Sequence, residues 1–290
     1  MALQSSGAIS LQDIQDEFTG SHPISLSEYY GVATLPSSGT ISVNQFYGTS
    51  NATYVAATGG TISTSGDYKT HTFTGSGTFT VSVAGNAAGS NSIEYVVVGG
   101  GGSRRGAYGG REAGGGGQAN TGTTTSFSAT SYTISVGGGS SNSTALGITG
   151  TKGNNGYNYQ GSGQAGASGT GRSGGGLGGG GGGCASNGSG NTNRSGCYGY
   201  TSTRGGNGGS GCSTIIGTKG GGGGGGGDKC GAGGSGGSGG GGNGCATGWK
   251  GSCNPSSGSA NSGGGGGGSN SSSSYNNGGS GIVALKYKFQ

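Results

Sequence analysis

Residues 220–227 read GGGGGGGG and residues 263–268 read GGGGGG, and the chain between Val98 and Gly281 is almost as rich in glycine throughout. Of the 290 residues, 85 are glycine and only 27% are hydrophobic. Segments without side chains cannot build an apolar core, and glycine loses more backbone freedom on folding than any other residue. These segments are therefore either disordered or packed backbone against backbone, and that choice decides the fold.

The composition is unlike that of most disordered chains, which are usually highly charged or rich in proline. Charged residues make up only 7% of this chain, and it has three prolines. Collagen is excluded because glycine does not recur at every third position. A flexible glycine linker is the alternative. We expect instead extended helices of three residues per turn, the glycine relative of polyproline II called polyglycine II, whose amides and carbonyls pair with neighbouring helices.

A period of three is visible in one stretch of the chain. Between residues 231 and 242, the residues Ala232, Ser235 and Ser238 lie three apart and are separated by glycines. A helix with three residues per turn would place all three on one edge.

Six cysteines lie in the glycine-rich half, and no two have the Cys-x-x-Cys spacing of a zinc site. An even number of cysteines where no core can form favours three disulfides, each contributing roughly 2–4 kcal/mol. Six free thiols are the alternative, and the sequence leaves the pairing open. The disulfide candidates are Cys184, Cys197, Cys212, Cys230, Cys245 and Cys253.

Three short repeats occupy the first 50 residues, at Ile9–Ile14, Ile24–Tyr29 and Ile41–Phe46. In each, a serine is followed three residues later by Asp, Glu or Gln, which is the spacing of a helix capping box. The second and third repeats end at Gly31 and Gly48, where glycine suits a left-handed helix end. The pattern predicts three helices of one or two turns.

Helices this short are marginal in water, so they need a partner to pack against. We expect residues 1–50 to dock on another protein, and a self-contained cap on the following domain is the alternative. The segment carries four acidic residues and no Lys or Arg, although the whole chain has a net charge of +5. The docking candidates are Ile9, Ile14, Ile24, Tyr29, Ile41 and Phe46.

Residues 51–150 have the alternating pattern of β structure. We expect one hairpin between Tyr68–Phe73 and Thr78–Val83, with His71 facing solvent, and a strand at Ile93–Val98. A second hairpin is expected between 126–128 and 132–136.

The last residues return to a strand pattern that matches the early β region. Val283, Leu285, Tyr287 and Phe289 share one face, so Ile282–Phe289 is expected to pair with the early strands. The predicted fold is mainly β and irregular, with a small antiparallel β unit and a polyglycine II bundle after an N-terminal segment of short capped helices. We expect two domains, 1–50 and 51–290, the second divided into β hairpins at 51–150, a glycine bundle at 151–281 and a closing strand at 282–290.

Several of these motifs together resemble a known family. The opening Ala2–Leu11 is similar to that of many phage virion proteins. The segments Gly59–Ile62, Tyr95–Gly102 and Gly279–Val283, with the strands between them, resemble the glycine-rich domain of phage tail and fibre proteins. This resemblance implies a virion component. The tail-fibre adhesins that use polyglycine II bundles imply binding of a host receptor by loops at the tip of the bundle. The six cysteines and the capped N-terminal helices depart from that pattern.

Catalysis has little support, because the chain has only eight carboxylate side chains, and its Gly-x-Ser-x-Gly matches follow from composition. Recognition is favoured by aromatic rings set among glycine and adaptable polar residues, as in antibody loops. Rings that cover the ends of the bundle are the structural alternative. The receptor-binding candidates are Tyr157, Tyr159, Tyr198, Tyr200, Trp249, Lys250 and Tyr275.

The expected function is that of a non-enzymatic phage virion protein, a tail-fibre or tail-tip adhesin with no cofactor, metal or nucleic acid. Its expected partners are other virion proteins, through residues 1–50, and a host cell-surface glycan or outer-membrane protein. The expected location is the virion, assembled in the host cytoplasm and extracellular after lysis. A head-decoration or fibre-forming subunit, and an ice-binding polyglycine II protein, are the alternatives. The sequence leaves open the receptor, the host, the oligomeric state and the position on tail or head.

Overall fold

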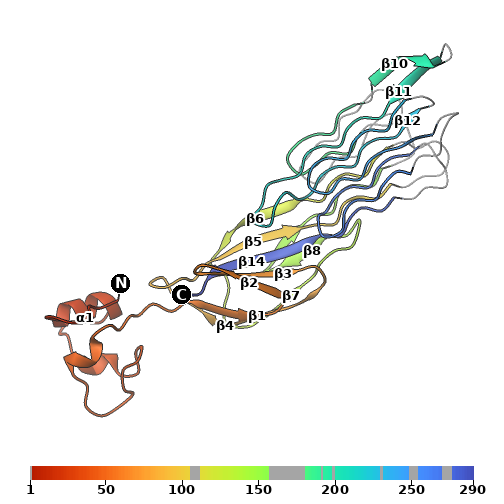
Figure 1. Cartoon of the computed structure of the whole chain (residues 1–290). Helices are drawn as coiled ribbons and strands as arrows, with labels where there is room; N and C mark the ends of the chain where they lie inside the picture. Colours follow the sequence, from red (N-terminus) through yellow and green to blue (C-terminus); the bar gives the residue numbers. More distant parts are fainter. Residues whose placement is uncertain are drawn as a thin grey trace.

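The chain is arranged as three parts in a row in the computed structural model (Figure 1). A group of short helices lies at one end, β-sheets form the middle, and glycine-rich segments run from the sheets to the other end. The structure describes residues 2–104, 112–156, 180–190, 192–197, 200–228, 231–247, 254–269 and 276–290.

The three N-terminal repeats form the helix α1 (Leu11–Phe18) and the 3-10 turns η1 (Leu26–Tyr29) and η2 (Val43–Phe46). Each begins with the predicted capping box, in which a serine and the acidic or amide residue three positions later bond to each other's backbone. Gly31 and Gly48 have φ angles of 75° and 68°, which confirms the predicted left-handed ends.

This N-terminal module has a small core of its own. Ile14, Phe18, Tyr29, Leu35 and Phe46 are buried together. The rings of Phe18, Tyr29 and Phe46 contact one another with centroids 5.7–6.0 Å apart. Aromatic packing at these distances adds to the burial of apolar area, so helices that are marginal alone stabilise one another.

Two antiparallel sheets form the middle of the molecule. The larger has the strand order β2 (Thr61–Ser65), β3 (Tyr68–Phe73), β14 (Ile282–Lys288), β5 (Ile93–Val98) and β6 (Ala119–Thr124). The smaller has the order β1 (Val55–Thr58), β4 (Gly77–Ala84) and β7 (Ser131–Ile134). Three short pairs follow: β8 (Ser143–Ala145) with β9 (Ile148–Gly150), β10 (Thr192–Cys197) with β11 (Tyr200–Arg204), and the parallel β12 (Gly227–Asp228) with β13 (Ala246–Thr247).

The main core lies between the two sheets. Phe79 and Val81 enter it from the smaller sheet, and Val97, Val283 and Leu285 enter it from the larger. The closing strand β14 lies between β3 and β5. Its alternate residues face this core as predicted, and Phe289 packs against the core just beyond the strand. The C-terminal strand therefore joins the two ends of residues 51–290 in one sheet.

Both predicted hairpins are wrong. β3 pairs with β2 through the two-residue turn Gly66–Asp67, whereas β4 pairs with β1 and β7 in the other sheet. Phe73 and Phe79 are both buried in the same core, so the chain crosses from one sheet to the other between them. Residues 126–128 are not a strand, and β7 pairs with β4. A turn sequence predicts that the chain changes direction, but it does not determine which strand pairs with which.

The expectation that His71 faces solvent is also wrong, because its side chain is fully buried. It points inward because it lies two residues before the buried Phe73 on the same strand. Its Nδ1 lies 2.7 Å from the carbonyl oxygen of Gly59, and its Nε2 lies 3.0 Å from the hydroxyl of Tyr287. A carbonyl can only accept, so Nδ1 carries the proton and Nε2 accepts from Tyr287.

The glycine-rich segments between Gly99 and Gly281 together form a glycine array. They are joined by backbone hydrogen bonds that follow a period of three. Along 114–118, the first and fourth amides donate to segment 263–266, the second and fifth to segment 151–154, and the third to Gly182. The donor–acceptor distances are 2.7–2.9 Å. Successive amides thus point to three different neighbours in rotation, as in a chain with three residues per turn.

Segment 221–225 repeats the same rotation. Its first and fourth amides donate to segment 239–242, its second and fifth to segment 206–209, and its third to Gly114. The carbonyls of Ala232, Ser235 and Ser238 accept from the amides of three glycines that are also spaced by three. The side chains of Ala232, Ser235 and Ser238 are all exposed, which agrees with their expected position on one edge.

The spacing between these segments leaves no room for side chains. A Cβ atom added at Gly223 would lie 2.2 Å from the carbonyl oxygen of Gly266, and one at Gly116 would lie 2.1 Å from that of Gly220. Distances this short require the backbone itself to move. Glycine is therefore needed at these positions for close approach rather than for an unusual φ angle.

We expect Gly223→Ala to lower the free energy of unfolding by about 1–3 kcal/mol, the usual cost of overpacking a close-packed interior. Chemical denaturation of the purified protein measures this change. Gly138→Ala is the matched control, because a Cβ there would have no neighbour within 4 Å. Equal stability of the two variants would contradict close packing of the glycine segments.

Burial lowers the pKa of His71, the hydrogen bond to Gly59 opposes this effect, and the nearby Lys69 lowers the pKa further. A histidine with a lowered pKa keeps its stabilising effect above its unfolded pKa of about 6.5, and the effect is lost as pH falls from there through the folded pKa. We therefore expect the free energy of unfolding to decrease as the pH falls below about 6.5.

This decrease should be absent in His71→Gln, whatever the absolute stability of that variant. Denaturation curves between pH 7.5 and 5 measure the slope for both proteins. A wild-type slope that persists unchanged in His71→Gln would mean that another group is responsible.

Candidate functional site

Described residues next to several of the gaps between the described ranges lie side by side. The amide of Arg104 donates to the carbonyl of Asn276 at 2.8 Å, and the amide of Gly156 donates to Ser103 at 3.0 Å. Cys245 and Ser269 form a parallel bridge next to the parallel pair β12–β13. The ends of these segments therefore meet at the part of the molecule opposite the N-terminal module (Figure 1).

Five of the seven receptor-binding candidates lie within three residues of these described flanks in the sequence. Tyr200 begins β11, and its side chain is outside the described part of the structure. The other six candidates lie outside the described residues: Tyr157, Tyr159, Tyr198, Trp249, Lys250 and Tyr275. Their sequence neighbours Gly156, Thr247 and Asn276 are described, and Thr247 belongs to β13, which pairs with β12 away from the N-terminal module (Figure 1).

Two charged side chains are buried near these flanks and were not singled out from the sequence. Arg104 is 2% exposed and Glu112 is 5% exposed. Both take part in interactions within the molecule. Buried charges are costly unless they are paired.

The docking candidates lie inside the N-terminal module. Ile14, Tyr29 and Phe46 are at most 1% exposed, and Ile9 and Ile41 pack against them. Ile24 is half-buried. Ile14, Tyr29 and Phe46 therefore serve the core of the module, whereas Ile9, Ile24 and Ile41 remain partly exposed.

The exposed surface of the module is acidic and includes the large apolar side chain of Leu11. Leu11 is 41% exposed. The pKa of Asp13 is lowered by hydrogen bonds from the amide and hydroxyl of Ser10. The pKa of Glu28 is lowered by hydrogen bonds from the amides of Ser21 and Ser25. Both carboxylates therefore remain ionised at neutral pH and give this end of the molecule a negative charge.

A disulfide joins Cys184 to Cys212 across 28 residues, with Cα atoms 5.2 Å apart. Closing a loop of this length stabilises a fold by about 3–4 kcal/mol in the chain-entropy account. Cys245 is also disulfide-bonded. The side chain of Cys197 is not described, and Cys230 and Cys253 lie outside the described residues.

The disulfide fixes one end of a rigid loop at residues 212–219. The backbones of Cys212 and Lys219 bond to each other twice, at 2.8 and 2.9 Å. At the tip, the hydroxyl of Thr214 lies 2.6 Å from the carbonyl oxygen of Gly217 and 3.2 Å from the amide of Ile216. Ile216 packs on an apolar patch of the larger sheet formed by Val96, Val98, Ile282 and Ala284.

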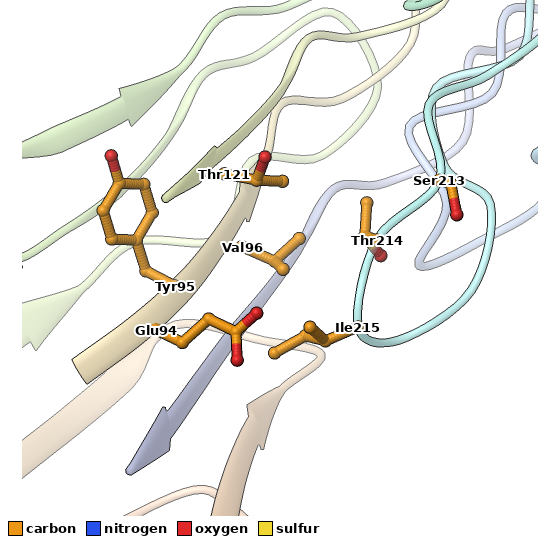
Figure 2. A pocket seen from close by; sticks show the side chains of 7 residues that line it. All are labelled: Glu94, Tyr95, Val96, Thr121, Ser213, Thr214 and Ile215. Atoms are coloured by element: carbon orange, nitrogen blue, oxygen red, sulfur yellow. The ribbon is translucent and has the colours of Figure 1, made fainter. Parts of the chain in front are cut away.

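A cavity of about 250 Å³ lies between this loop and the outer face of the larger sheet. Its lining residues come from β5, β6 and the loop, namely Glu94, Tyr95, Val96, Thr121, Ser213, Thr214 and Ile215. Figure 2 shows that the Tyr95 ring points away from the other six side chains. No sequence signal marks this site, because three segments far apart in the chain form it.

Glu94 is the charged residue of the cavity lining, and its charge is already balanced. Its Oε2 lies 3.3 Å from Nζ of Lys286 on the neighbouring strand β14. Among the described residues, no three His, Cys, Asp or Glu side chains are arranged to hold a metal ion. In the same part of the chain, no helix has the length and apolar character needed to cross a membrane.

Comparison with known proteins gives one match. No curated protein and no solved structure is similar to the chain. Residues 72–288 match the family described as the glycine-rich domain. This match begins in β3 and ends with β14, so it covers most of the sheet region and all of the glycine-rich segments. The chain therefore belongs to the glycine-rich domain family.

Proposed function

We propose that this chain is a non-enzymatic phage virion protein, a tail-fibre or tail-tip adhesin that binds a receptor on the host surface. The observation that carries this proposal is the arrangement of the molecule along one axis (Figure 1). The N-terminal module lies at one end, and the flanks of the segments rich in aromatic residues meet at the other. A protein of this shape can be held at one end and make contact with a surface at the other.

Within this proposal, the glycine-rich segments form a polyglycine II bundle that acts as a rigid spacer. Support comes from the period of three in their hydrogen bonds and from the absence of room for a Cβ between them. Cα–H···O contacts, which add about 0.5–1 kcal/mol each, become available at such short separations. A rigid spacer reduces the entropy lost when the loops at its end bind.

The N-terminal module is proposed to hold the protein on the particle. It has its own core and is joined to the sheets by a short segment. At that junction, Glu17 accepts hydrogen bonds from the amide of Asn51 and the hydroxyl of Ser50. The negative surface of the module favours a partner with a basic surface.

Deletion of residues 2–50 is expected to remove the protein from assembled particles while the remainder still folds, because the core between the two sheets uses no residue of the module. Immunoblots of purified particles measure incorporation, and circular dichroism of the truncated protein checks its fold. A folded truncated protein that remains on particles would contradict the docking role of the module.

Replacement of Tyr157 or Trp249 by alanine is expected to weaken adsorption of particles to host cells by about tenfold or more, as for aromatic residues at the centre of an interface. Tyr68→Ala is the matched control, because Tyr68 is an aromatic residue on β3 with 44% exposure. Counting unadsorbed particles over time measures the effect. Normal adsorption by both variants, or by particles that lack the protein, would favour a head-decoration role.

A further inference from the structure

We propose that the cavity between β5, β6 and loop 212–219 binds a single uncharged sugar ring. This inference rests on the proposed function only for the source of the sugar, which would be a host-surface glycan. The site itself is distinct from the aromatic residues proposed to bind the receptor, because it lies at the sheet end of the glycine array (Figures 1 and 2). It would give the protein a second point of contact with a glycan.

The size of the cavity limits the ligand to one small ring. Its volume of about 250 Å³ lies below the range of roughly 300–1,000 Å³ that is usual for drug-sized ligands. The cavity is partly open to solvent. A ring held there could continue into a longer chain outside the cavity.

Three polar side chains of the lining keep hydrogen-bonding capacity, whereas the Thr214 hydroxyl is bonded within its own loop. The hydroxyls of Thr121 and Ser213 have no hydrogen-bond partner among the described residues, and Glu94 uses Oε2 for Lys286 and leaves Oε1 available. Each hydroxyl can both donate and accept, whereas the carboxylate only accepts. This combination suits a ligand that carries several hydroxyl groups.

The charge of the lining argues against an ionic ligand. Lys286 balances the charge of Glu94, so the local charge favours neither an anion nor a cation. The apolar part of the lining includes the buried Val96 and Ile215, whose side chain is 39% exposed on a rigid loop. Hydroxyl groups on one side and C–H groups on the other are the features of a sugar ring, which would place its C–H face on Ile215.

The cavity is preformed, which favours weak ligands that cannot drive a rearrangement. The Cys184–Cys212 disulfide and the paired backbones of Cys212 and Lys219 fix the base of the loop. Ile216 anchors its tip on the sheet, next to the exposed Ile215. Little of the protein has to become ordered when a ligand binds, so little of the contact energy is lost to conformational entropy.

The test uses the purified full-length protein and saturation-transfer NMR with glucose, galactose, mannose, rhamnose and N-acetylglucosamine as separate probes. We expect transfer to at least one of them, with a dissociation constant of about a millimolar, as for a single ring with few contacts. The variant Thr121→Val, which removes one free hydroxyl and keeps the shape of the side chain, should weaken this binding by about fivefold. Thr121→Trp, which fills the cavity, should abolish it.

The matched control is Thr123→Val, on the same face of β6 but outside the cavity lining. It should bind as the wild type does. The proposal is overturned if no sugar shows transfer to the wild-type protein, or if Thr121→Trp binds as well as the wild type. Loss of transfer in Trp249→Ala together with unchanged transfer in Thr121→Trp would place the sugar at the receptor-binding end. Because this assay uses no particles or cells, its outcome is independent of the adsorption experiments.

Discussion

Hydrogen bonding between backbones that have no side chains is the interaction on which the rest of this structure depends. An ordinary domain offsets the entropy of ordering its chain by burying apolar side chains. The glycine-rich segments cannot do so, and their amides instead bond in rotation to three neighbouring segments. The same closeness that makes these bonds excludes a Cβ, as at Gly223 and Gly116. The need for close backbone approach thus accounts for both the composition and the hydrogen-bond pattern of the glycine-rich segments.

The sheets fix the position at which the glycine-rich segments next to them begin. The glycine array has no side-chain core that could do this. β5 leads into the array at Gly99, and β14 leaves it at Gly281. The amide of Gly99 bonds to Gln118 just before β6, so the ladder of the larger sheet continues into the array without a break. The apolar core between the sheets sets the register of β5, β6 and β14, and the segments that extend from them begin already aligned. The Cys184–Cys212 disulfide adds a covalent constraint where side-chain packing is least.

The features suited to binding lie at the two ends of the molecule and beside loop 212–219. The N-terminal module has an ionised acidic surface over its own aromatic core, at one end of the molecule. At the other end, described residues that precede or follow the aromatic-rich segments in the sequence are held side by side by backbone hydrogen bonds. The cavity beside loop 212–219 lies where this loop of the glycine-rich region meets the outer face of the larger sheet. A rigid frame with recognition placed on its loops is the usual division of labour in binding proteins.

The sequence by itself determined what depends on near neighbours in the chain. The capping boxes, the glycine ends of the short helices and the inward face of β14 follow from spacings of two to five residues, and all were predicted correctly. Only the tertiary structure decided the partners. β3 and β4 lie in different sheets because Phe73 and Phe79 enter the same core from opposite sides, and His71 is buried because Gly59 and Tyr287 satisfy both of its nitrogens. The cavity unites β5, β6 and a loop some 90 residues further along the chain. Such contacts depend on how distant segments pack, which no local spacing encodes.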